Sequence, residues 1–251
     1  MCRLGGHSKA AMLCLPCSVM GAKMDHENSM DAAKTLILNA ALAHVAFDGW
    51  SDITLQAAVA DSGVAVGLGR ALYPRGGVDL AIAYHQRGDQ AMKAALSATD
   101  MTAYRFRDRI ALAVRLRLDA ADKELVRRGS ALFSLPGHAP EGVKLICGTA
   151  DAIWTALGDT STDLNWYTKR ATLSAVYTAS VLFWLGDHSE GNADTWAFLD
   201  RRIENVMQFE KTKAAVRDNP LAKALLRGPM KILESIHAPK SVQDLPGHGD
   251  S

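Results

Sequence analysis

The fold is indicated most clearly by residues 161–170, which read STDLNWYTKR. Ser161, Thr162 and Asp163 have short polar side chains of the kind that accept backbone N–H groups in the first turn of a helix. Asp163 also suits the positive end of the helix dipole. We therefore predict that a helix begins here and runs toward Leu185.

Two adjacent aromatic residues, Trp166 and Tyr167, stand near the start of this predicted helix. Successive helical residues point about 100° apart, so one narrow buried stripe rarely takes both rings. The face that we predict to be buried recurs at helical spacing and comprises Trp166, Leu173, Val176, Tyr177, Ser180 and Trp184. Tyr167 and Arg170 fall on the neighbouring face, which is otherwise small and polar.

This neighbouring face is a candidate surface for binding a partner protein, because Tyr, Trp and Arg dominate the energetics of many interfaces. The candidate partner-binding residues are Asp163, Trp166, Tyr167 and Arg170. The alternative is an ordinary aromatic pair at a helix entrance, with no role in recognition.

Composition points to a helical protein without a strong overall field. The 251 residues carry 28 Lys and Arg against 27 Asp and Glu, a net charge of +1, so no global charge recruits nucleic acid. Ala and Leu are abundant, Pro is sparse and alternating β-branched runs are absent, which favours an all-α fold. Four cysteines in a chain this long do not make a disulfide framework, and a reducing cytoplasm is the expected compartment.

The N-terminal part of the chain has a helix-turn-helix layout. Residues 1–28 are predicted to be a disordered tail, although residues 1–23 superficially resemble a signal or transit peptide. Residues 29–98 then show a helix, two short helices near residues 54–61 and 65–73, and a further helix over residues 78–96. The first three of these helices predict a small helix-turn-helix-type three-helix domain, and the helix over residues 78–96 follows before the domain boundary.

The short helix that would read DNA, over residues 65–73, carries one cation, Arg70. Contacts to phosphates and base edges need Lys, Arg, Asn or Gln side chains. The preceding short helix has Asp52 and Asp61 and no basic residue, so its charge would repel a duplex. We therefore predict a degenerate domain that binds no nucleic acid.

Residues 99–218 are predicted to form a second, helical ligand-binding domain. Its first helix, over residues 104–132, is rich in arginines paired with acids at helical spacing. Apolar stripes follow on a helix that ends before Gly158, on the Trp166 helix and on a long helix from Asp194. Periodicity alone fits a filled core as well as a lipid pocket.

Residues 219–237 are predicted to be an amphipathic helix at a membrane surface, followed by a polar tail over residues 238–251. The segment is too short and too charged to span a bilayer. The predicted membrane-binding residues are Leu221, Lys223, Leu225, Leu226, Arg227, Met230, Lys231, Leu233 and Ile236. The alternative is a helix folded back on the core.

The sequence carries no recognisable catalytic or metal-binding motif. A phosphate-binding loop, a nucleophile elbow and paired C-x-x-C motifs are all absent. The single E-x-x-H, from Glu234 to His237, is half of what a di-iron bundle needs. We expect no enzymatic activity, no cofactor and no metal.

Five segments between Arg107 and Arg217 resemble the ubiquinone-biosynthesis accessory family called Coq-nine. They are residues 107–115 (RDRIALAVR), 127–129 (RRG), 149–154 (TADAIW), 163–170 (DLNWYTKR) and 194–199 (DTWAFL). The resemblance implies an all-α, TetR-like homodimer at the inner face of a membrane that binds an isoprenoid quinone or a phospholipid and presents it to a di-iron demethoxyubiquinone hydroxylase. The family's partner-binding patch maps onto the Trp166-Tyr167 pair.

The resemblance also implies a lipid pocket in the second domain. The residues that we predict to line it are Ile146, Ala150, Trp154, Leu173, Tyr177, Trp184, Trp196, Leu199 and Ile203. The alternative function is a TetR-like transcriptional regulator that binds DNA and a hydrophobic ligand.

Overall fold

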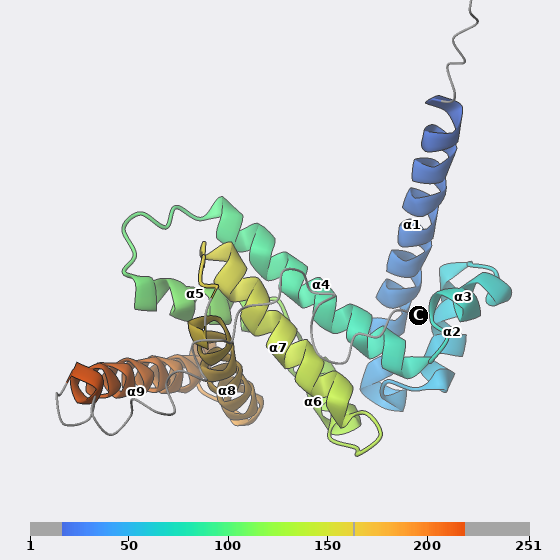
Figure 1. Ribbon diagram of the computed structural model, residues 1–251. Helices are drawn as coiled ribbons and strands as arrows, with labels where there is room; N and C mark the ends of the chain where they lie inside the picture. The colour runs from blue at the N-terminus through green and yellow to red at the C-terminus, as the bar shows by residue number, and fades with distance from the viewer. Residues whose placement is uncertain (1–16, 163, 219–251) are drawn as a thin grey trace, which may run out of the picture.

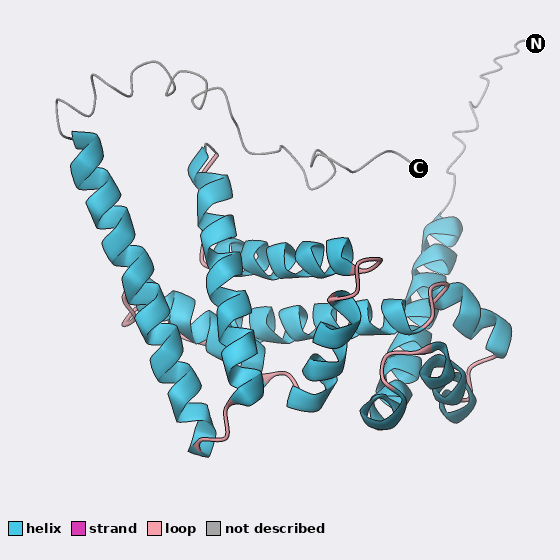
Figure 2. Cartoon of the chain, turned by 90° about the horizontal axis from the view of Figure 1, so that it is seen from below, coloured by secondary structure: helices cyan, strands magenta, loops and turns pink. Residues whose placement is uncertain are grey.

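The computed structural model describes residues 17–162 and 164–218, and all regular structure within these ranges is helical (Figures 1 and 2). The elements are α1 (Cys17–Asp48), α2 (Asp52–Ser62), α3 (Val66–Leu72), α4 (Gly77–Ala98), α5 (Phe106–Asp119), α6 (Lys123–Phe133), α7 (Ala139–Ala156), α8 (Leu164–Gly186), the 3-10 turn η1 (Glu190–Asn192) and α9 (Ala193–Asp218). The predicted all-α fold is confirmed.

Helices α1 to α3 gather at one end of the molecule and α8 and α9 at the other, while α4 and α7 run side by side between them (Figure 1). At the first end, α2 starts at Ser51, whose Oγ accepts the Thr54 N–H at 3.2 Å. It ends at Gly63, whose φ of 69° is a left-handed conformation that favours glycine. Helix α1 begins at Cys17, so the boundary predicted at Ser29 is corrected for residues 17–28. Residues 1–16 lie outside the described part.

The close approach of α3 to α2 explains a glycine inside α3, where glycine has a low helix propensity. A Cβ at Gly69 would lie 2.5 Å from Val59 Cγ2, so only glycine fits there without a shift. The outer side of α3 exposes Val66 and Leu68 beside Arg70. The surface of the helix that would read DNA is therefore largely apolar.

Two hydrophobic cores share α4. The first core holds residues of α1 and α2 together with Leu80 and Ala81 of α4, while Met92 and Leu96 of α4 belong to the second core with α5, α7, α8 and α9. Leu125 of α6 lies in the first core although it follows α5 in the chain. A helix that was predicted to belong to the second domain therefore packs in the core of the first domain.

The helix predicted over residues 104–132 is divided into α5 and α6. Asp122 starts α6, because its Oδ1 accepts the N–H groups of Glu124 at 2.8 Å and of Leu125 at 3.0 Å. Lys123 at the start of α6 donates to the Asp187 carbonyl at 2.6 Å, which ties it to the end of α8. The charged residues of the segment 104–132 recur at helical spacing without a break, so the sequence pattern did not reveal Asp122 as a helix N-cap.

The predicted membrane-surface helix over residues 219–237 and the tail over residues 238–251 lie outside the described residues. Among the helices that the structure describes, none is both long and apolar enough to cross a membrane.

Candidate functional site

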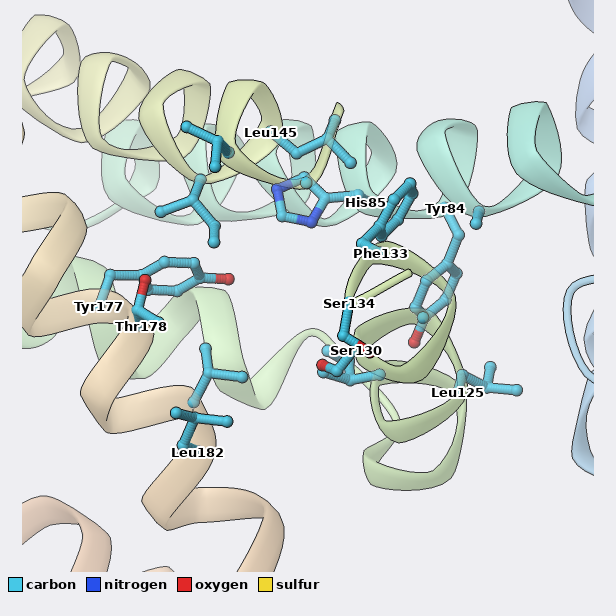
Figure 3. Close-up of a pocket in the computed structure, with 18 of the residues that line it drawn as sticks. Tyr84, His85, Leu125, Ser130, Phe133, Ser134, Leu145, Tyr177, Thr178 and Leu182 are labelled. Carbon is cyan, nitrogen blue, oxygen red and sulfur yellow. The ribbon is translucent and has the colours of Figure 1, made fainter. Parts of the chain in front are cut away.

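A cavity of about 300 Å³ lies where the two cores meet, enclosed by α4, α5, α6, α7 and α8 (Figure 3). Its walls include Trp50, Ala81 and Leu125 from the first core and Leu118 and Tyr177 from the second. Most of the lining is apolar, and the volume is at the low end of the range of small-molecule sites. The cavity can therefore hold a small group or the end of a longer molecule.

The opening of the cavity is marked by two exposed apolar side chains. Val143 of α7 is 61% exposed and Leu182 of α8 is 63% exposed, and both line the cavity. Single exposed apolar residues are common on proteins, but these two continue an apolar cavity to the surface.

Two of the nine residues predicted to line a lipid pocket, Ile146 and Tyr177, line this cavity. The other seven do not and are packed with one another in or against the second core: Ala150, Trp154, Leu173, Trp184, Trp196, Leu199 and Ile203. The three apolar stripes of α7, α8 and α9 thus fill the space between them. The open space lies beside α6, whose division from α5 the sequence did not reveal.

A buried polar network stands at the α4 and α5 side of the cavity. The Arg117 side chain is 4% exposed; its Nε donates to Asp89 Oδ1 at 2.6 Å and its Nη2 to the His85 carbonyl at 3.0 Å. Thr149 Oγ1 lies 2.9 Å from Asp89 Oδ1 and 2.8 Å from His85 Nε2. A Cβ at Gly88 would lie 2.5 Å from Arg117 Nη1, so this glycine makes room for the guanidinium group.

His85 is neutral at physiological pH in this network. Burial, followed by the positive charge of Arg117, lowers the pKa of His85 to about 4, against the opposing effect of Asp89. The unfolded chain, with an ordinary pKa near 6.5, binds a proton that the folded protein excludes. The contribution of the neutral His85 to the free energy of unfolding is therefore fully present above pH ~6.5 and is lost as the pH drops toward ~4.

Replacing His85 with glutamine is expected to flatten this pH dependence, because glutamine keeps a hydrogen-bonding group beside Thr149 but does not titrate. Urea unfolding between pH 4 and 7 measures the pH dependence of stability. With each unit that the pH falls, the free energy of unfolding of the parent should drop by up to about 1.4 kcal/mol more than that of the variant. Parallel curves for the two proteins would show that His85 is not the group being protonated.

A second cluster surrounds Trp166 and Arg170 at the start of α8. The Arg170 guanidinium lies over the Trp166 ring at 4.0 Å, and the Trp166 and Tyr167 rings meet edge to face at 4.8 Å. Both rings are half-buried, whereas Arg170 is buried. The interpretation of Arg170 as a surface residue is therefore wrong.

Arg170 is held by acidic residues on two sides. Its Nε donates to Asp151 Oδ1 at 2.6 Å and its Nη1 to Asp159 Oδ2 at 3.1 Å. Lys169 donates to the other oxygen of Asp159 at 2.7 Å. Burial would raise the pKa of Asp159, but the hydrogen bonds from Lys169, Ser161 and Arg170 lower it to about 2, so this carboxylate stays ionised.

Residues 161–170 thus include residues of the ion-pair cluster and residues with accessible side chains. Ser161 donates to Asp159 and accepts from Lys169, which places it in the ion-pair cluster. Asp163 lies outside the described residues. Tyr167 and the outer side of Trp166 remain as accessible aromatic surface beside this cluster.

The helix arrangement defines the class of protein. The crystal structure of the TetR transcriptional regulator from Nitrosomonas europaea superposes with a TM-score of 0.57 and 20% sequence identity, covering 68% of this chain and 95% of that one. At this level of identity the likeness shows the fold: the protein has a TetR-like, all-α fold, as predicted.

The sequence comparisons identify the family. A profile of the COQ9 family matches residues 139–210. The mitochondrial ubiquinone biosynthesis protein COQ9 of Rattus norvegicus is 36% identical over 122 residues, which are 49% of this chain and 38% of that protein. The Drosophila melanogaster protein of the same name is 30% identical over 187 residues, 72% of this chain and 57% of that one. COQ9-B of Xenopus laevis is 27% identical over 221 residues, 84% of this chain and 74% of that one.

The chain belongs to the COQ9 family, which is the Coq-nine family that the sequence resembled. The match spans less than two-fifths of the length of the rat relative. The profile match includes all of α7 and all of α8 with the Trp166 and Tyr167 pair.

Proposed function

We propose that the protein is a non-enzymatic lipid-binding protein of ubiquinone biosynthesis, which holds a polyprenyl-quinone intermediate in its cavity and presents it to the demethoxyubiquinone hydroxylase. The observation that carries this proposal is the apolar cavity between α4 and α8, which continues to exposed Val143 and Leu182. The COQ9 relatives, which are ubiquinone biosynthesis proteins, support the assignment to this pathway.

Such a cavity suits the end of an isoprenoid molecule. Apolar walls contribute about 25 cal/mol for each Å² of ligand surface removed from water, without requiring directional contacts. A volume of about 300 Å³ is too small for a long polyprenyl chain, so the rest of the chain leaves through the opening. Residues 219–237, with their predicted apolar and basic faces, would hold the protein at the membrane that supplies the ligand.

Replacing Ser130 with phenylalanine is expected to fill the cavity and abolish co-purifying lipid. Ser130 of α6 lines the cavity, so a ring at this position competes for the same space (Figure 3). The neighbouring residue Ala131 is exposed and does not line it, which makes Ala131→Phe the matched control. Native mass spectrometry with lipid extraction should find isoprenoid lipid on the parent and on Ala131→Phe, but not on Ser130→Phe. Equal lipid on both variants would contradict the proposed location of the site.

For the docking of the hydroxylase we propose the accessible aromatic surface formed by Trp166 and Tyr167. Half-buried aromatic rings lose little conformational entropy on binding and remove much area from water, which is typical of interface hot spots. Arg170 supports this surface from below by lying over the Trp166 ring. The homodimer expected from the resemblance remains part of the same proposal.

A further inference from the structure

One hydroxyl group that faces the cavity makes no hydrogen bond within the described part of the protein. Tyr177 is 3% exposed, lines the cavity, and points its hydroxyl group from α8 into it (Figure 3). Its hydroxyl makes no hydrogen bond to any residue that the structure describes. The other buried polar groups nearby are engaged: Arg117 with Asp89, and His85 with Thr149. A hydroxyl group that faces an apolar cavity without a protein acceptor is free to donate to a bound ligand.

The charges around this hydroxyl balance. Arg117 is the cation of this region, and its Nε lies 2.6 Å from the Asp89 carboxylate. Burial raises the pKa of Tyr177 above its ordinary value and lowers that of His85, so the phenol and the imidazole are both neutral at physiological pH. Tyr84, the other phenol on the cavity wall, also has a raised pKa because of burial, and its Oη accepts the Asp122 N–H at 2.9 Å. Because Arg117, which lines the cavity, is already paired with Asp89, an anionic ligand group would find no unmatched positive charge.

Resting on the proposed function, we propose that the cavity selects an uncharged ligand head with a hydrogen-bond acceptor, such as a ring carbonyl or methoxy oxygen, and that Tyr177 donates its hydroxyl proton to that acceptor. This assigns the head of the molecule to the inner cavity and its hydrocarbon tail to the opening. Along α8, Leu182 lies five residues beyond Tyr177, or about 7.5 Å at the rise of an α-helix. A single substituted ring spans this distance.

The substitution Tyr177→Phe tests the proposal because it removes only the hydroxyl group. Tyr73→Phe is the matched control, since it makes the same chemical change to a buried tyrosine that does not line the cavity and whose hydroxyl donates to the Lys34 carbonyl at 2.9 Å. Three probes with the same farnesyl tail would be titrated into the full chain: a dimethoxy-1,4-benzoquinone, the hydrocarbon without a head, and the corresponding carboxylic acid. Melting curves of each variant show that it is folded.

We expect the parent to bind the benzoquinone more tightly than the hydrocarbon or the acid. In Tyr177→Phe the affinity for the benzoquinone should fall about fivefold, the size of one lost neutral hydrogen bond, with that for the hydrocarbon unchanged. In Tyr73→Phe neither affinity should change. Unchanged benzoquinone affinity in Tyr177→Phe, or tightest binding of the acid, would overturn the assignment of the head while leaving lipid binding in place. If no probe binds the parent, both this inference and the proposed function fail.

Discussion

Replacing Arg117 with methionine is expected to lower the free energy of unfolding by about 3 kcal/mol or more. The arginine side chain is 4% exposed and that of its partner Asp89 is 14% exposed, so the substitution leaves a carboxylate desolvated and without its counter-charge. Removing one member of a buried ion pair is costly for this reason, even where the intact pair adds little. Methionine keeps the apolar part of the side chain, which restricts the change to the charge and its hydrogen bonds.

Urea unfolding at pH 7 measures this effect, and Arg115→Met on the same helix is the control. Arg115 pairs with Asp200 at 3.1 Å, but both side chains are substantially exposed. Exposed pairs contribute about 0 to 1 kcal/mol, so the control should stay within that range. The double variant Arg117→Met, Asp89→Asn should recover part of the loss. Equal losses for the two arginines would contradict the buried character of the network.

Replacing Arg170 with alanine is expected to cost about 3 kcal/mol of stability, whereas Tyr167→Ala should cost about 1 kcal/mol. Arg170 is buried between Asp151 and Asp159, and Asp159 keeps its charge through that contact. Tyr167 is half-buried and packs edge to face on Trp166. The two residues of one motif should therefore differ in stability and in binding.

Titration against the purified hydroxylase separates the two roles. Tyr167→Ala should weaken the complex by about 30-fold, the effect of a hot-spot residue, at nearly unchanged stability. Arg170→Ala should lose affinity only to the extent that the folded fraction falls. If Tyr167→Ala binds the hydroxylase as tightly as the parent, the aromatic pair has no docking role.

Periodicity predicted the helices and many of the buried residues. The stripe of α8 is a clear case, since Leu173, Val176, Tyr177, Ser180 and Trp184 are all buried as expected. Apolar spacing reports which face of a helix is turned inward, and this information is local. It does not report whether neighbouring helices close the space between them.

Predicting the cavity would have required knowing how neighbouring helices pack against one another. Its position follows from the break between α5 and α6, where Asp122 starts a new helix in a run of charges that otherwise continues at helical spacing. Arg117 was expected to be a solvated helix charge and Arg170 a residue of the partner-binding surface, because a sequence does not show that an acid from a distant helix lies within hydrogen-bonding distance. Asp122 as a capping residue followed by Glu124 was the one local signal that could have revealed the division.

The sharing of α4 between the two cores has a consequence for cooperativity. Trp50 donates to the Leu125 carbonyl at 3.1 Å and Arg128 to the Ala46 carbonyl at 2.9 Å, so α6 also joins the helix-turn-helix end to the cavity. Unfolding of either core would expose buried residues of the other core. We therefore expect the chain to melt in a single transition. A ligand in the cavity would then slow amide exchange throughout α1 and α2, including at residues that do not line the cavity.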